Sequence, residues 1–63
     1  MTESEPFLSV EEVAERFGVA PSWVYKQAEA RRIAYYRVGR YLRFDPVDID
    51  AYVRRHRIEP ADA

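Results

Sequence analysis

The sequence contains no cysteine and a single histidine, His56, so neither a disulfide nor a zinc site can hold this 63-residue chain together. A chain of this length forms one domain at most and buries a modest share of its surface. The composition is globular, because 48% of the residues are hydrophobic and 14% are aromatic. The fold must therefore depend on one small hydrophobic core, and the sequence predicts no metal and no cofactor.

The chain shows no sign of a membrane-bound or secreted protein. No apolar run approaches the length that spans a membrane, and residues 1–6 are polar and acidic. We therefore expect no signal peptide, no membrane partner and a cytoplasmic, nucleoid-associated protein. Residues 1–6 are expected to form a flexible arm, residues 7–57 the folded domain and residues 58–63 a flexible tail.

A first helix is expected to run from Val10 to Arg16 or Phe17. Ser9 and Glu12 have the spacing of a capping box at its start. Gly18 suits the left-handed residue that often ends a helix. The apolar residues of this segment recur at helical spacing and form one buried face; they are Val10, Val13, Ala14 and Phe17.

A second helix is expected at Pro21–Ala30, because proline suits the first helical position. Val24 and Ala28, four residues apart, define its buried stripe, so Ser22, Trp23 and Lys26 fall on the opposite face. Two interpretations stay open for this face. Ser22 is either a DNA-reading residue or an alternative N-cap, and Trp23 either points outward or folds back under the hairpin described next.

Residues 34–44 are rich in aromatic and β-branched residues around Gly39, which predicts a β-hairpin. A two-residue loop at residues 39–40 would pair Arg37 with Leu42 and Tyr36 with Arg43. That pairing mixes basic and apolar side chains on both faces of the hairpin.

A three-residue loop at residues 39–41 instead pairs Val38 with Leu42 and Tyr36 with Phe44 on one face. It places the two strand arginines, Arg37 and Arg43, together on the other. We expect this register, because it separates core residues from charged ones. Two arginines side by side also indicate an anion lying over them.

Asp45 and Pro46 are expected to begin a third helix, as its N-cap and first residue. Ile49, Tyr52 and Val53 form its apolar stripe, and we interpret His56 as a packing or capping residue. The expected fold is mainly α with a small β-hairpin: helix, turn, helix, two-stranded wing and third helix, a winged helix-turn-helix.

Charge is unevenly distributed, although the formal net charge is only −1. Residues 1–15 carry five acidic side chains and no basic one, whereas residues 16–44 carry seven basic side chains and one acidic one. A basic middle between acidic flanks is typical of a region that binds phosphate.

This basic region coincides with the second helix and the wing, the two elements that meet double-stranded DNA in a winged helix-turn-helix. On the helix, the residues expected to face the major groove are Ser22, Trp23, Lys26 and Gln27. On the wing, Arg40 is expected to enter the minor groove beside Gly39, with Arg37 and Arg43 on phosphates. Arg31 and Arg32 are two further candidate phosphate contacts.

Three stretches together resemble a known family, and they are Leu8–Val19, Pro21–Lys26 and Arg37–Asp48. In this order they resemble the excisionase-type helix-turn-helix family, which is related to the DNA-binding heads of MerR-type regulators. The resemblance covers about residues 7–55. The chain departs from the family pattern at Ala20, where serine is usual, at Arg31, where glycine is usual, and at Ala34, where proline is usual.

The resemblance implies a recombination directionality factor. Such a protein binds attachment-site DNA cooperatively beside copies of itself, bends the DNA and directs an integrase towards excision. The alternative is a small MerR-like transcription regulator that uses the same DNA-binding surface.

Other classes of function have weaker support. The sequence lacks a nucleophile–base pair, a cluster of metal ligands and a phosphate-cradling glycine loop, so it does not predict an enzyme. It also predicts no small-molecule ligand. A protein-interaction module, in which the acidic face of the first helix binds a basic partner, is the remaining alternative. In that case Lys26 and Arg40 would not be needed for binding the partner.

Overall fold

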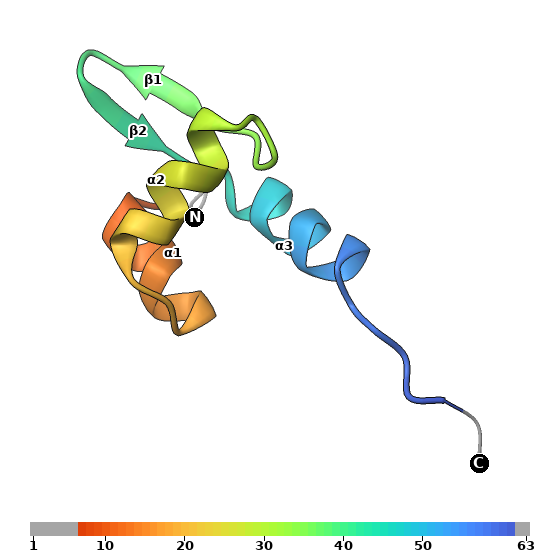
Figure 1. Ribbon diagram of the computed structural model, residues 1–63. Helices are drawn as coiled ribbons and strands as arrows, with labels where there is room; N and C mark the ends of the chain where they lie inside the picture. Colours follow the sequence, from red (N-terminus) through yellow and green to blue (C-terminus); the bar gives the residue numbers. More distant parts are fainter. Residues whose placement is uncertain (1–6, 62–63) are drawn as a thin grey trace, which may run out of the picture.

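The computed structural model describes residues 7–61 and shows three helices around a small core, with a two-stranded hairpin projecting from them (Figure 1). The elements in chain order are α1 (Val10–Phe17), α2 (Pro21–Glu29), β1 (Tyr36–Val38), β2 (Tyr41–Arg43) and α3 (Pro46–Arg55). This order confirms the mainly helical, winged helix-turn-helix fold. The expected arm at residues 1–6 and the last two residues of the expected tail lie outside the described residues.

The core draws apolar side chains from all three helices and from the residues that flank the hairpin. Its buried members are Val10, Val13, Ala14, Val24, Ala28, Ile33, Phe44 and Ile49. Phe44, which directly follows β2, is fully buried. Its backbone exchanges two hydrogen bonds with Leu8, of 2.8 and 2.9 Å. This bridge joins the segment before α1 to the base of the hairpin and encloses one side of the core.

Both ends of α1 are closed as the sequence predicts. The N–H of Glu12 donates to Ser9 Oγ over 3.1 Å, and the N–H of Ser9 donates to Glu12 Oε1 over 2.8 Å, so the capping box is complete. At the other end Gly18 has a φ of +72°. The N–H groups of residues 18 and 19 bond back to the carbonyls of Glu15 and Ala14.

Helix α2 begins at Pro21 with Ala20 as an N-cap that supplies no side-chain hydrogen bond. Ser22 is therefore the second helical residue, and its interpretation as an alternative N-cap is wrong. The helix ends at Glu29, one residue earlier than expected. The residue that closes the turn is Arg31, whose φ is +60°.

The hairpin has the two-residue loop, so the expected three-residue loop is wrong. The pairs are Tyr36 with Arg43, Arg37 with Leu42 and Val38 with Tyr41. Gly39 has a φ of +62°. A glycine with positive φ at the first of two loop positions is what a type II′ turn requires.

The expected register failed because it assumed that one face of both strands belongs to the core. All three residues of β1 are exposed and no residue of β2 is fully buried. The buried Phe44 lies beyond the strand and takes Leu8 as its partner. Without a buried strand face, separation of charged from apolar residues does not select the register, and the turn selects it instead.

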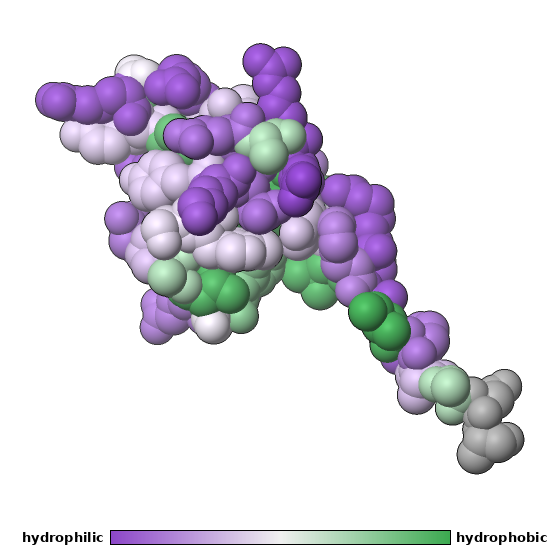
Figure 2. All heavy atoms as spheres, in the orientation of Figure 1, coloured by the Kyte–Doolittle hydropathy of each residue, from purple (hydrophilic) through white to green (hydrophobic). Residues whose placement is uncertain are grey.

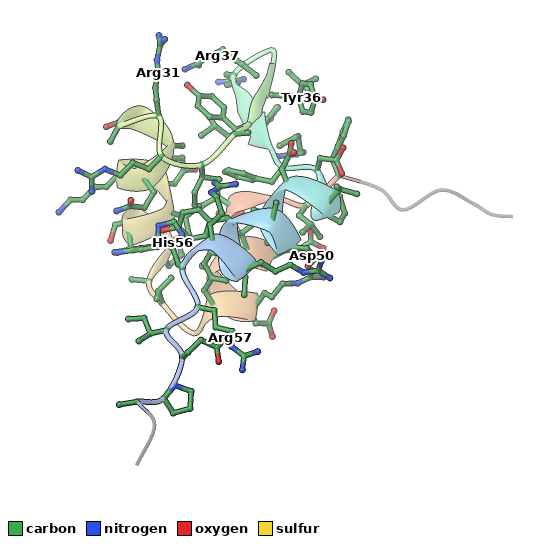
Figure 3. All side chains as sticks on the ribbon, turned by 90° about the vertical axis from the view of Figure 1, so that its right-hand side faces the viewer. Arg31, Tyr36, Arg37, Asp50, His56 and Arg57 are labelled. Atoms are coloured by element: carbon green, nitrogen blue, oxygen red, sulfur yellow. The ribbon has the colours of Figure 1, made fainter. Side chains whose placement is uncertain are left out.

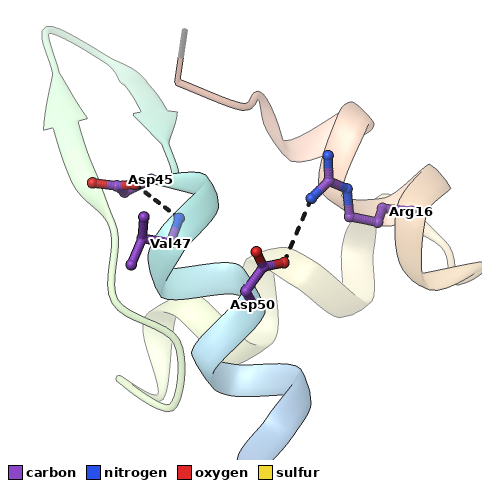
Figure 4. A network of polar contacts seen from close by, with 4 residues as sticks. All are labelled: Arg16, Asp45, Val47 and Asp50. Carbon is purple, nitrogen blue, oxygen red and sulfur yellow. Dashed lines mark hydrogen bonds and ion pairs between the residues drawn. The ribbon is translucent and has the colours of Figure 1, made fainter. Parts of the chain in front are cut away.

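Helix α3 packs on the core through Ile49, which is fully buried. Asp45 caps its start, because its Oδ1 accepts a 2.9 Å hydrogen bond from the N–H of Val47 (Figure 4). One turn further on, Asp50 lies 3.9 Å from Arg16 of α1. Both side chains of this ion pair are largely exposed, so we expect it to contribute little to stability.

Candidate nucleic-acid interface

Helix α2 presents a polar face to solvent. Ser22 and Lys26 are exposed and lie one helical turn apart, with Gln27 half-buried beside them. On the opposite side Val24 and Ala28 are fully buried. The helix is therefore held by its apolar stripe. Its exposed residues include Ser22 and Lys26, which are of the polar types that read base edges or contact phosphates, beside Tyr25 and Glu29.

Trp23 takes neither of the two orientations that the sequence left open. It is half-buried, and its indole packs edge-on against Phe17 of α1, with ring centroids 6.1 Å apart. Phe17 in turn stacks on Tyr52 of α3 at 5.9 Å. A large apolar ring gains more from this burial than from facing water. Trp23 therefore holds α2 against α1 instead of standing free on the recognition face.

The ring contacts that run from Trp23 through Phe17 to Tyr52 end at His56. Its ring stacks on Tyr52 with centroids 4.0 Å apart, and its Nδ1 lies 2.9 Å from the Tyr52 carbonyl oxygen. A carbonyl only accepts, so Nδ1 carries the proton and donates. His56 is also the C-cap of α3. Its interpretation as a packing and capping residue is confirmed.

The two faces of the hairpin differ in chemistry. Because opposite residues share a face, Arg37 and Leu42 form the inner face, and Tyr36, Val38, Tyr41 and Arg43 form the outer face. Leu42 is half-buried against the core, so the inner face is turned towards the helices. Figure 3 shows Arg31 and Arg37 projecting along the same edge of the molecule, with Tyr36 on the other side of the hairpin.

Arg37 and Arg43 do not form the expected pair. They lie on opposite faces, and the half-buried Arg43 donates from Nη1 to the Leu42 carbonyl over 2.7 Å. The Arg43 guanidinium also lies 5.2 Å from the centre of the Tyr41 ring. The expectation of one anion between these two arginines is therefore wrong, because it depended on the three-residue loop.

The remaining wing and turn arginines are all exposed. Arg40 is the second residue of the loop, at the tip of the wing, and Arg31 and Arg32 follow the end of α2. Residues 30–44 contain five arginines and no acidic residue. Figure 2 shows hydrophilic side chains gathered over the hairpin and along α2. The wing and the turn that follows α2 thus carry an excess of exposed positive charge that attracts phosphate, whereas α2 itself carries one cation, Lys26, and one exposed anion, Glu29.

The sequence pattern does not single out two residues at the tip of the wing. Val38 and Tyr41 form the last pair before the loop and are 54% and 55% exposed. The three-residue loop had assigned Val38 to the core and Tyr41 to the turn. Gly39 at the first loop position was the signal that could have corrected this, because it favours a two-residue type II′ turn.

A helix-turn-helix whose second helix shows a polar face beside a basic two-stranded wing defines a DNA-binding domain of the winged helix-turn-helix class. The comparison with protein families agrees with the geometry. The chain belongs to the helix-turn-helix domain family, whose model matches residues 7–57. This is a DNA-binding family that includes excisionase-like proteins and is typically non-enzymatic.

The searches of curated proteins and of solved structures found no match. Within residues 7–61, no helix combines the length and the apolar character needed to cross a bilayer. The family, together with the surface of α2 and the wing, therefore supports sequence-specific binding of double-stranded DNA.

Proposed function

We propose that this protein is an excisionase-like architectural factor that binds double-stranded DNA through α2 and the wing, bends it and directs an integrase towards excision. The observation that carries the proposal is the exposure of Ser22 and Lys26 on α2 together with the exposed arginines of the turn and wing that follow this helix. The excision role rests on the resemblance of Leu8–Val19, Pro21–Lys26 and Arg37–Asp48 to excisionase-type proteins.

In the proposed complex α2 lies in the major groove. Ser22, Lys26 and Gln27 supply the side chains that reach base edges or phosphates, and Trp23 sets the position of the helix through Phe17. Lys26 is the side chain with the longest reach on this face and the only cation within α2. It is therefore the residue whose removal should weaken binding most on the helix.

The wing supplies the second contact. Arg40 beside Gly39 enters the adjacent minor groove, where a narrow groove concentrates negative potential. Arg37 on the inner face, with Arg31 and Arg32 at the end of α2, contacts the phosphate strand between the two grooves. Arg43 is half-buried and its Nη1 already donates to the Leu42 carbonyl, so fewer of its N–H groups are available to a phosphate and we assign it the weakest phosphate contact.

Copies of a DNA-binding domain gain affinity from neighbours on the same duplex. Copies bound to adjacent repeats raise one another's effective concentration on the DNA, and bending brings separate sites together. A cooperative, head-to-tail array beside an attachment site is therefore the proposed working form, with the integrase as its protein partner.

The DNA-binding step is tested with a duplex selected from a random library by the wild-type protein. We expect Lys26→Ala and Arg40→Ala each to weaken binding and to reduce the slope of log K against log salt by about one. The matched control is Arg55→Ala, which removes an exposed cation from the last turn of α3. If Lys26→Ala and Arg40→Ala bind this duplex like the wild type, the proposed contacts of α2 and the wing are wrong. If the wild type selects no duplex from the library, the protein is an interaction module instead.

The cellular role is tested by locating the protein on the chromosome. Chromatin immunoprecipitation should recover attachment-site DNA, and gel shifts on its tandem repeats should show a cooperative ladder and a bend. Occupancy of promoters without attachment sites would overturn the excision role and identify a MerR-like transcription regulator that uses the same surface.

A further inference from the structure

The tip of the wing carries an apolar pair that lies outside the hydrophobic core. Val38 and Tyr41 face each other across the hairpin, and each keeps more than half of its side chain exposed. Neither belongs to the core or to the partly buried residues packed against it. By contrast Tyr36, on the same outer face nearer the core, packs on Phe7 with ring centroids 5.1 Å apart.

The charges around Val38 and Tyr41 indicate which kind of partner binds to them. Arg43 lies 5.2 Å and Arg40 6.0 Å from the centre of the Tyr41 ring, so two cations flank the apolar surface. No acidic residue occurs between residues 30 and 44 to offset them. A partner must therefore offer negative charge next to apolar surface. The minor groove of DNA offers both, because phosphates line its edges and deoxyribose rings form its walls.

We propose that Val38 and Tyr41 form a minor-groove contact that packs against the deoxyribose wall, widens the groove and bends the duplex. This inference rests on the proposed function, in which Arg40 enters the minor groove. When the tip of the wing enters the minor groove, the inner face of the hairpin, with Arg37, meets the phosphate strand that separates this groove from the major groove. The outer face then meets the opposite strand, and apolar side chains pressed into a minor groove are a known cause of bending.

The test compares Val38→Ser/Tyr41→Ser with the wild type on one selected duplex labelled at both ends for energy transfer. We expect affinity to fall on the order of tenfold, because the double variant loses the partial burial of two apolar side chains, and the bend angle to decrease. The slope of log K against log salt should stay unchanged, because no phosphate contact is removed. Arg40→Ala should lower that slope, which separates the two contacts.

A control variant outside the proposed contact tests whether the effect belongs to the apolar pair. Val47→Ser removes an equally apolar side chain, 72% exposed, from the first turn of α3 and should bind and bend DNA like the wild type. Circular dichroism checks that each variant is folded, and Val38→Thr, which is nearly isosteric, replaces the double variant if that one unfolds.

The outcomes separate this inference from the function on which it rests. If the wild type binds and bends DNA but the double variant does so equally, or if the salt slope falls with the double variant, the inference is overturned and the proposed function stands. Tighter binding to single strands than to the duplex would also overturn it. If the wild type binds no duplex at all, the proposed function itself fails.

Discussion

The N–H of Arg32 donates a 3.0 Å hydrogen bond to the carbonyl of Gln27, and the turn that this bond closes holds Arg31 at a φ of +60°. The N–H of Arg31 adds a second bond of 3.0 Å to the Ala28 carbonyl, which completes a Schellman motif. Glycine usually occupies the left-handed position of this motif, because a Cβ costs about 1–2 kcal/mol there. Strain that persists in a small domain indicates a role for the side chain, here the proposed phosphate contact.

Arg31→Gly should therefore raise stability while it weakens DNA binding. Relief of the strain exceeds the added entropy of glycine in the unfolded chain, so we expect a net gain of about 0.5–1 kcal/mol in the free energy of unfolding. The slope of log K against log salt should fall by about one. Urea unfolding and anisotropy titrations measure the two effects. Arg32→Gly is the matched control: it loses the same charge but relieves no positive φ, so it should lower stability.

A second prediction concerns the turn of the wing. A Cβ at Gly39 would meet no atom within 4 Å, so only its φ of +62° opposes substitution. We expect Gly39→Ala to lower the free energy of unfolding by about 1 kcal/mol, a fall in Tm of about 4–8 °C for a domain of this size. Arg40→Ala, at the next loop position, should leave the Tm unchanged. A Tm for Gly39→Ala equal to that of the wild type would refute the strained turn.

What the sequence could predict depended on the range of the interactions. Helix α1 was predicted almost to the residue, because Ser9, Glu12 and Gly18 act within the helix itself. The hairpin register was not, because Phe44 is buried through its bridge to Leu8, far away in the sequence. Separation of charged from apolar residues was therefore misleading for a strand pair with no buried face.

In the candidate site, too, features set by local interactions could be predicted, whereas features set by contacts distant in the sequence could not. The exposure of Ser22 and Lys26 follows from the helical period and the buried Val24, so it could be predicted. The place of Trp23 could not, since its partner Phe17 belongs to another helix. The exposure of Val38 and Tyr41 at the tip of the wing depends on the strand register. Because the predicted register was wrong, this exposure was not predicted.

A third prediction concerns the contact between Trp23 and Phe17. Because the indole is half-buried, we expect Trp23→Ala to lower the free energy of unfolding by about 2 kcal/mol, less than the cost at a fully buried site. A double-mutant cycle with Phe17→Ala should give a coupling energy of about 0.5–1.5 kcal/mol. Ser22→Ala, on the exposed side of the same helix, should change stability by less than about 0.5 kcal/mol. A coupling energy near zero would mean that the two rings do not stabilise each other.

The capping box of α1 should affect stability without affecting DNA recognition. Ser9→Ala removes the acceptor for the N–H of Glu12 and should cost about 1 kcal/mol, a substantial share of the roughly 3–9 kcal/mol expected for a domain of this length. Ser9→Thr keeps a hydroxyl acceptor and should lose less. The proposed complex assigns no DNA contact to Ser9, so the folded Ser9→Ala variant should bind the selected duplex with wild-type affinity and salt slope. A loss of affinity at temperatures where the variant is fully folded would show that α1 also contacts the DNA.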